Sequence, residues 1–236
     1  MNENQLLEAI TKYFKEVIFE NHKNNVLKNH TKLSSYQINP ILVKYLSKIL
    51  EDNFTPLGIA KALYYPRVLG TSISTSFGTR IQKMFVELNL AKGSLIPEMD
   101  IEFVDKVDNR KKYCQLKSGP NTINAGDVGP LIRKFSKVSN LARTNTMSLN
   151  NSDLILGVLY GEQSQLSQHY KKIDATYPVY IGTEFWHRIT GYSDFYAKLV
   201  SILDKMILEL DTENFFEEGC QKLAVEIEAS TLFDFE

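Results

Sequence analysis

The spacing of apolar residues predicts helices over most of the first ninety positions of the chain. Leucine, isoleucine and phenylalanine residues recur there at intervals of three and four, which is the period of one buried helix face. Thr55 followed by Pro56 is a typical N-cap and first-turn pair, and it starts the third of these helices. The predicted helices cover residues 3–21, 40–50, 55–65 and 74–92.

Beyond residue 95 the apolar period shortens to that of β-strands. Two alternating segments flank the polar turn "DKVDNR", and two short apolar runs are typical of buried strands. These predicted strands cover residues 99–104, 112–117, 153–161 and 177–182. Further helices are predicted over residues 128–142, 183–191 and 193–210. This order of elements predicts an α/β fold in which helices flank a central mixed β-sheet, with a mostly helical N-terminal part.

The length and composition favour one domain. No segment has the composition of a linker, and 236 residues, 43% of them hydrophobic, are enough for one sizeable core. We therefore expect a single domain over residues 1–236. Its three parts are a helical N-terminal part (1–90), a core (91–200) and a C-terminal helical tail (201–236).

The composition also indicates where the protein works. The N-terminal segment lacks the basic and then apolar pattern of a signal peptide, and no apolar run approaches a membrane span. Cys114 and Cys220 are too few for a disulfide framework, which fits a reducing compartment. We expect a cytoplasmic protein without a membrane partner.

Charge is unevenly distributed along the chain, although the formal net charge is only −1. Between Lys106 and Arg143 nine basic residues are opposed by two acidic ones, whereas from Asp204 onward ten acidic residues face two basic ones. A basic centre beside an acidic end fits the electrostatic footprint of a protein that binds a polyanion. Such runs are equally common on solvated faces, so charge alone leaves both interpretations open.

The predicted hairpin over residues 99–117 has one apolar and one polar face. Because side chains alternate along a strand, Asp100 and Glu102 share a face on the first strand, and Gln115 and Lys117 share a face on the second. Antiparallel pairing then brings Asp100 close to Gln115 and Lys117. An acid, an amide and an amine are expected to converge on one patch.

This combination suits phosphodiester hydrolysis assisted by Mg²⁺. Asp100, the side-chain carbonyl of Gln115 and the backbone carbonyl of Leu116 are hard oxygen ligands for the ion. Lys117 orients or deprotonates the attacking water, or offsets charge on the phosphate. Glu102 is either a further ligand or an anchor behind the ligands. From spacing alone, however, an ordinary hairpin with a stabilising Asp–Lys pair is the better interpretation.

The segments "PEMDIEFVD" and "KKYCQLKSGPNTINAGD" resemble the active-site motif of the PD-(D/E)xK nuclease superfamily. Three further blocks resemble type II restriction endonucleases of that superfamily: "YYPRVLGTSISTSFGTRIQ", "QLKSGPNTIN" and "VYIGTEFWHRITG". The resemblance covers separate segments between about residues 60 and 200. Together these blocks are far more specific than the D…QxK spacing. It implies a restriction-endonuclease-like core.

Carried over residue by residue, the resemblance places the motif aspartate on Asp100 and the lysine on Lys117. Gln115 falls where most members have a second acid, a known variant that removes one negative charge from the metal site. The motif proline is Pro97, which is not contiguous with Asp100. Family members often add an acid or amide from the preceding helix. The candidates here are Gln82 and Glu87, and Glu87 is also placed to pair with Lys83 one helical turn away.

The resemblance also favours DNA contacts by residues around the motif. Small polar side chains follow Lys117, and basic residues lie on the next predicted helix and on the helix before the hairpin. The candidate DNA-binding residues are Arg80, Ser118, Asn121, Thr122, Asn124, Arg133, Lys134 and Lys137. A surface loop leading into a helix would use Asn and Gly in a similar way.

The function implied by the resemblance is a Mg²⁺-dependent type II restriction endonuclease. Such an enzyme belongs to a bacterial restriction–modification system and acts as a homodimer. It cuts double-stranded DNA at a short palindrome and leaves 5′-phosphate ends, and the N-terminal helices are the expected dimer surface. The alternatives are a repair or junction-resolving nuclease on the same core, a catalytically inactive DNA-binding module, and a purely structural protein.

Overall fold

The structure is a computed structural model that describes residues 1–145, 148–210 and 214–235. The chain forms two compact units, each with its own core. Unit 1 consists of Met1–Tyr13 and Gly78–Ile207, and unit 2 consists of Phe14–Phe77 and Leu208–Glu236. These units cut across the three parts expected from the sequence, because an amphipathic helix pattern does not reveal which core a helix joins. The assignment of the whole chain to one nuclease domain stays a prediction.

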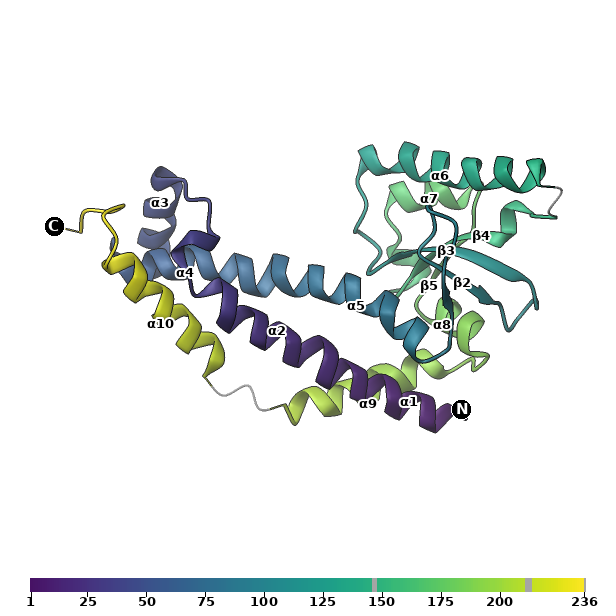
Figure 1. Ribbon diagram of the computed structural model, residues 1–236, viewed down its shortest axis with the longest axis horizontal. Helices are drawn as coiled ribbons and strands as arrows, with labels where there is room; N and C mark the ends of the chain where they lie inside the picture. Colours follow the sequence, from purple (N-terminus) through teal and green to yellow (C-terminus); the bar gives the residue numbers. More distant parts are fainter. Residues whose placement is uncertain (146–147, 211–213, 236) are drawn as a thin grey trace. The chain divides into compact units, whose positions relative to one another are not determined.

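Unit 1 is built on a five-stranded mixed sheet with the strand order β1-β2-β3-β4-β5. Strands β2 to β5 are labelled in Figure 1. The strands are β1 (Lys92–Gly93), β2 (Ile101–Val104), β3 (Lys111–Lys117), β4 (Leu154–Val158) and β5 (Val179–Ile181). Pairs β1–β2 and β2–β3 are antiparallel, whereas β3–β4 and β4–β5 are parallel. The predicted α/β fold with a central mixed sheet is confirmed.

Helices cover both faces of this sheet (Figure 1). One face packs against α6 (Ala125–Thr144) and α7 (Gln168–Asp174), through a core that includes Phe135 and Tyr170. On the other face the ring of Phe103 contacts Phe185, the first aromatic residue of the block "FWHRITG". The remaining helices of unit 1 are α1 (Glu3–Tyr13), most of α5 (Ile73–Glu87), α8 (Thr183–Thr190) and α9 (Phe195–Leu208).

Unit 2 is helical. Its α-helices are α2 (Glu20–Asn25), α3 (Pro40–Glu51), α4 (Pro56–Pro66) and α10 (Phe215–Glu228). Three π-helical segments, Phe14–Phe19, Val26–His30 and Arg67–Ser72, extend the helices. As predicted, Thr55 caps α4, because its hydroxyl accepts a hydrogen bond from the backbone N–H of Gly58 at 3.0 Å. No helix within the described ranges has both the length and the apolar composition to cross a membrane.

Helix α3 turns its apolar face outward. It packs against α4 through the opposite face, where Ser47 lies so close to Gly58 that a Cβ there would meet the Ser47 hydroxyl at 2.2 Å. The outward residues are Ile41, Leu42, Tyr45, Leu46, Ile49 and Leu50, of which Ile41 is 79% exposed. We call this set the α3 face. The helical period identified the stripe correctly, but the sequence did not indicate that the stripe lies outside the unit's core.

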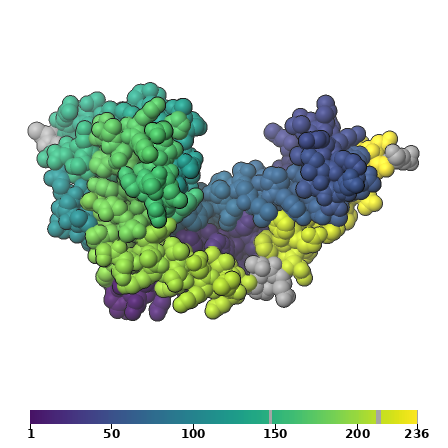
Figure 2. All heavy atoms as spheres, turned by 180° about the vertical axis from the view of Figure 1, so that it is seen from behind, coloured from purple at the N-terminus to yellow at the C-terminus, as the bar shows by residue number. Residues whose placement is uncertain are grey.

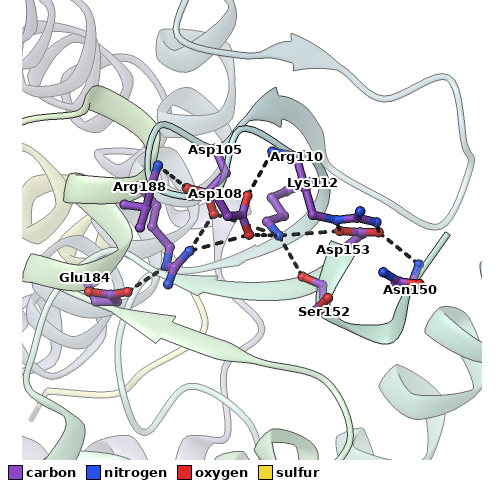
Figure 3. Close-up of polar contacts among 10 residues, drawn as sticks. Asp105, Asp108, Arg110, Lys112, Asn150, Ser152, Asp153, Glu184 and Arg188 are labelled. Atoms are coloured by element: carbon purple, nitrogen blue, oxygen red, sulfur yellow. Dashed lines mark hydrogen bonds and ion pairs between the residues drawn. The ribbon is translucent and has the colours of Figure 1, made fainter.

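A buried charge network fixes the end of the β2–β3 hairpin that lies farthest from Lys117 (Figure 3). Lys112 is fully buried, and its Nζ lies 2.6 Å from Asp108 Oδ2 and 3.5 Å from Asp153 Oδ1. Arg110 and Arg188 add ion pairs to the same acids and to Asp105 and Glu184. We call these seven residues the Lys112 network. It joins the hairpin turn to the start of β4 and to α8.

The Lys112 network makes stability sensitive to acid. Burial alone would raise the pKa of Asp153, but the hydrogen bond and charge of Arg110 outweigh burial and lower it. Lys112 lowers the pKa of Asp108 against burial in the same way. Because the folded-state pKa values lie below the unfolded ones, this stabilisation is complete above the unfolded values near 4 and is lost as the pH falls through the folded values.

We therefore expect the free energy of unfolding to change little between about pH 6 and 7 and to fall steeply below about pH 4. Urea denaturation at stepwise pH measures this. The variant Asp153→Asn should be less stable at neutral pH and should show a shallower fall in acid. Equal stability of the wild type at pH 3 and pH 7 would contradict the assignment.

Candidate functional site

The predicted acid, amide and amine lie at one edge of the sheet. Asp100 immediately precedes β2, and its backbone N–H donates to the Cys114 carbonyl at 2.9 Å, so the strand pairing continues to this residue. Gln115 and Lys117 are in the C-terminal half of β3, on the face covered by α6 and α7. Gln115 is buried, whereas Asp100 and Lys117 are half-buried. The alternation of strand side chains therefore predicted the shared face correctly.

The Asp100 carboxylate is held by the backbone of β3. Its Oδ2 accepts a hydrogen bond from the Leu116 N–H at 2.7 Å. In an extended strand the N–H and C=O of one residue point to the same side, so the Leu116 carbonyl also faces the Asp100 side of β3. The carboxylate and this carbonyl are thus neighbouring oxygen donors, and Asp100 Oδ1 has no hydrogen-bond partner among the described residues.

The Gln115 amide has its nitrogen engaged. Nε2 donates to the Glu98 carbonyl, which lies in the segment leading to Asp100. An amide whose nitrogen is fixed in this way has its oxygen left to bind a cation or water. Gln115 therefore supplies a neutral oxygen in a fixed orientation. A carboxylate at the same position would be repelled by the Glu98 carbonyl oxygen.

Lys117 is the cationic residue of the candidate site. Its ammonium forms no ion pair and no side-chain hydrogen bond with any residue in the described ranges, Asp100 included. Its backbone is fixed, because the Lys117 carbonyl accepts from the Leu159 N–H at 3.0 Å. An anchored backbone with an unpaired ammonium leaves that ammonium available to a water or a phosphate.

Glu102 is committed to other partners. Its Oε1 accepts from the Ser94 hydroxyl at 2.7 Å and from the Leu95 N–H at 3.2 Å, while Oε2 lies 2.6 Å from Lys111 Nζ. Burial would raise the pKa of Glu102, but the hydrogen bonds from Lys111 and Ser94 lower it overall. With both oxygens engaged, Glu102 is better suited to anchor the segment before Asp100 than to bind an ion directly.

Acidic residues alone do not form a metal centre in the described part of the chain. No group of three or more His, Cys, Asp or Glu residues there is placed to hold an ion. Gln82 and Glu87 lie on α5, and neither forms a hydrogen bond or ion pair with Asp100. The expected ion pair between Glu87 and Lys83 is not formed either. A metal held by Asp100 would take its other ligands from amide or backbone oxygens, water or a phosphate.

In the loop after Lys117, some polar side chains are hydrogen-bonded within the protein and others have no partner among the described residues. Ser118 and Asn121 form no side-chain hydrogen bond with the described residues, so both are available to a ligand. Thr122 bonds within the loop, and Asn124 caps α6 by accepting from the Gly126 N–H at 2.8 Å. The interpretation of this segment as a helix entry therefore holds for Asn124, while Ser118 and Asn121 keep the potential for DNA contact.

The basic footprint is smaller than the sequence indicated. Four of the nine central basic residues form ion pairs with carboxylates: Arg110, Lys111, Lys112 and Lys137. The pair of Lys137 is with Glu98 at 3.3 Å, and it is exposed and therefore weak. Arg133 and Lys134 on α6, and the side chain of Arg80 on α5, have no such partner among the described residues.

Two residues beside the site carry no sequence signal. Tyr170 of α7 reaches the loop after Lys117 with its hydroxyl, and Glu98 holds Gln115 through its backbone carbonyl. A buried tyrosine in an amphipathic helix is indistinguishable from an ordinary core residue in the sequence, and a backbone acceptor can belong to any residue type. Both roles depend on contacts across long stretches of chain.

The comparisons with known proteins agree with the geometry. A family model described as type II restriction endonuclease EcoO109I matches residues 8–211 of this chain, which include every candidate site residue. No curated protein matches the chain.

Proposed function

Because this chain belongs to the type II restriction endonuclease EcoO109I family, we propose that it cuts double-stranded DNA at a short palindrome, with Mg²⁺, and leaves 5′-phosphate ends. The family makes it a site-specific deoxyribonuclease, a hydrolase. Within this proposal the enzyme works in the bacterial cytoplasm as part of a restriction–modification system. The observation that supports the proposal is the hydrogen bond from the Leu116 N–H to the Asp100 carboxylate, which places Asp100 beside the end of β3 that carries Gln115 and Lys117.

The donors at this edge fit Mg²⁺, which this family generally uses. Asp100 Oδ1, Gln115 Oε1 and the Leu116 carbonyl are all hard oxygens, and an ion held by one or two carboxylates keeps several waters. When bound, the ion would polarise the phosphate and acidify a water. A single carboxylate with a neutral amide should bind the ion more weakly than a pair of carboxylates would.

The protein's own groups then have separate roles. Asp100 is oriented by the Leu116 N–H, so its free oxygen is aimed before the substrate arrives. Lys117, unpaired in the described part of the chain, orients or deprotonates the attacking water, or offsets charge on the phosphate. Glu102 holds the segment before Asp100 in place through Ser94, Leu95 and Lys111.

Digestion of phage DNA tests this function. We expect discrete fragments with Mg²⁺ and none with a chelator, and end-mapping should show 5′ phosphates at one recurrent sequence. Cleavage that depends on nicks or junctions would favour a repair or junction-resolving nuclease instead. Binding of duplex DNA without any cleavage would indicate an inactive DNA-binding module.

We further propose that the α3 face joins two copies of this chain. A palindromic site calls for a two-fold protein, and a two-fold interface uses the same patch on both copies. The α3 face supplies six exposed apolar side chains on one helix. The segment that contains this helix is coloured dark blue in Figure 2. A contiguous apolar surface of this kind marks an interaction site rather than ordinary scatter.

The variant carrying Leu46→Lys and Ile49→Lys is expected to sediment with the mass of one chain, whereas the wild type sediments with the mass of two. Burying four ammonium groups, two from each copy, in an apolar interface is too costly for the dimer to persist. Val225→Lys, at a residue of α10 that is 64% exposed, is the matched control and should leave the dimer intact. A monomeric wild type at micromolar concentration would contradict the proposal.

A further inference from the structure

The hydroxyl of Tyr170 is a buried polar group without a role in the cleavage described above. Tyr170 is fully buried in the core between the sheet and helices α6 and α7. Its Oη donates to the Gly119 carbonyl at 2.9 Å and lies 2.8 Å from Thr122 Oγ1. Thr122 Oγ1 in turn donates to the same Gly119 carbonyl at 3.0 Å. The ring is fixed by core packing, so its hydroxyl is a rigid anchor for the loop.

This arrangement commits both hydroxyl groups to the loop itself. Three oxygens lie within 3.0 Å of one another and share two hydroxyl protons, so each proton has an acceptor inside the cluster. Burial raises the pKa of Tyr170 to about 12, although the hydrogen bond with Thr122 opposes this, so the phenol keeps its proton over the working pH range. The hydrogen bond from the Tyr170 hydroxyl to the loop therefore does not depend on pH in this range.

Further contacts leave the loop little freedom near Lys117. The Ser167 N–H donates to the Pro120 carbonyl at 3.3 Å. Gly119 lies so close to the ring of Tyr160 that a Cβ at Gly119 would meet the Tyr160 hydroxyl at 2.3 Å. On either side of these fixed points, Ser118 and Asn121 present side chains without hydrogen-bond partners in the described ranges. The backbone of the loop is thus held in place, while the side chains of Ser118 and Asn121 remain able to donate hydrogen bonds to a ligand.

We propose that Tyr170 is a positioning residue for DNA sequence recognition: with Thr122, it holds the loop so that Ser118 and Asn121 meet base edges at a fixed distance from Lys117. The proposal rests on the nuclease function proposed above and names a determinant of its specificity. Pre-positioned donors discriminate between bases because a misplaced partner leaves them unpaired, whereas a mobile loop readjusts to wrong sequences.

The test compares Tyr170→Phe with Tyr177→Phe. Tyr177 is a buried tyrosine of the same core whose hydroxyl lies 3.3 Å from Ser136 Oγ, away from the loop. Single-turnover cleavage rates are measured on duplexes carrying the mapped site and on duplexes with one base pair substituted. We expect Tyr170→Phe to lower the ratio of the rate on the mapped site to the rate on the substituted site by about tenfold. The rate on the mapped site itself should change by less than about threefold. Tyr177→Phe should leave the ratio unchanged.

A merely structural role for Tyr170 would not move this ratio, because a partly unfolded enzyme loses activity on both duplexes equally. Thr122→Val, which removes the second hydroxyl at an exposed position, should lower the ratio in the same way, and Thr122→Ser should restore it. The effects of Tyr170→Phe and Thr122→Val together should be less than additive, since both remove one cluster.

The outcomes separate the two proposals. Cleavage by the wild type with an unchanged ratio in both Tyr170→Phe and Thr122→Val overturns the role of Tyr170 and leaves the nuclease function standing. Absence of cleavage by the wild type on any duplex overturns both.

Discussion

Lys117→Ala is expected to lower the rate of DNA cleavage by about a thousandfold while duplex DNA still binds. The ammonium is unpaired within the described part of the chain, so its removal breaks no ion pair or hydrogen bond that holds the fold together. In the proposed function, the lost group is the one that activates the water or offsets charge on the phosphate, and both effects act mainly in the transition state. Single-turnover cleavage and gel-shift binding, the latter with Ca²⁺ in place of Mg²⁺, measure the two effects separately.

Two variants control this experiment. Lys172→Ala, at an exposed lysine of α7, removes an equal charge away from the site and should cut at the wild-type rate. Asp100→Asn should resemble Lys117→Ala in cleavage, because it removes the charged oxygen donor while the amide oxygen can still accept from Leu116. Normal cleavage by Asp100→Asn would show that the active site lies elsewhere.

Lys112→Met is expected to lower the free energy of unfolding by about 3–5 kcal/mol, the largest stability effect of the variants considered. The hydrocarbon part of the side chain is retained, so little packing is lost. Removing the ammonium leaves Asp108 and Asp153 short of a counter-charge, and the Ser152 carbonyl loses its donor at 3.0 Å. Because Asp105 and Asp153 are almost fully buried, water cannot compensate for the lost cation. Urea denaturation at neutral pH measures the change.

Lys172→Ala again serves as the control and should change stability by less than about 0.5 kcal/mol, as is usual for an exposed site. The double variant Lys112→Met with Asp153→Asn should recover part of the loss, because one uncompensated negative charge is removed together with its partner. If the urea midpoint of Lys112→Met equals that of the wild type, the Lys112 network does not stabilise the hairpin.

Much of the fold is determined by local periodicity. The alternation around the "DKVDNR" turn located β2 and β3 to within two residues, and the Thr55–Pro56 pair located the start of α4. The same alternation placed Asp100 with Gln115 and Lys117, since a strand has only two faces and one was needed for the core. The helix predicted over residues 183–191 is present as α8, and its Phe185 and Trp186 are both buried.

The sequence by itself determined the element types and the polar strand faces of Asp100 and Lys117, because these follow from intervals of two to four residues. The order of helices and strands along the chain indicated the mixed sheet. Only the tertiary structure decided which charges are paired. Lys112 and Lys117 are five residues apart on β3, yet one is buried among aspartates and the other is unpaired in the described ranges. The tertiary structure also decided that the stripe of α3 faces outward and that Tyr170 closes the loop after Lys117. Such choices depend on which distant segments pack together, and that information is absent from local spacing.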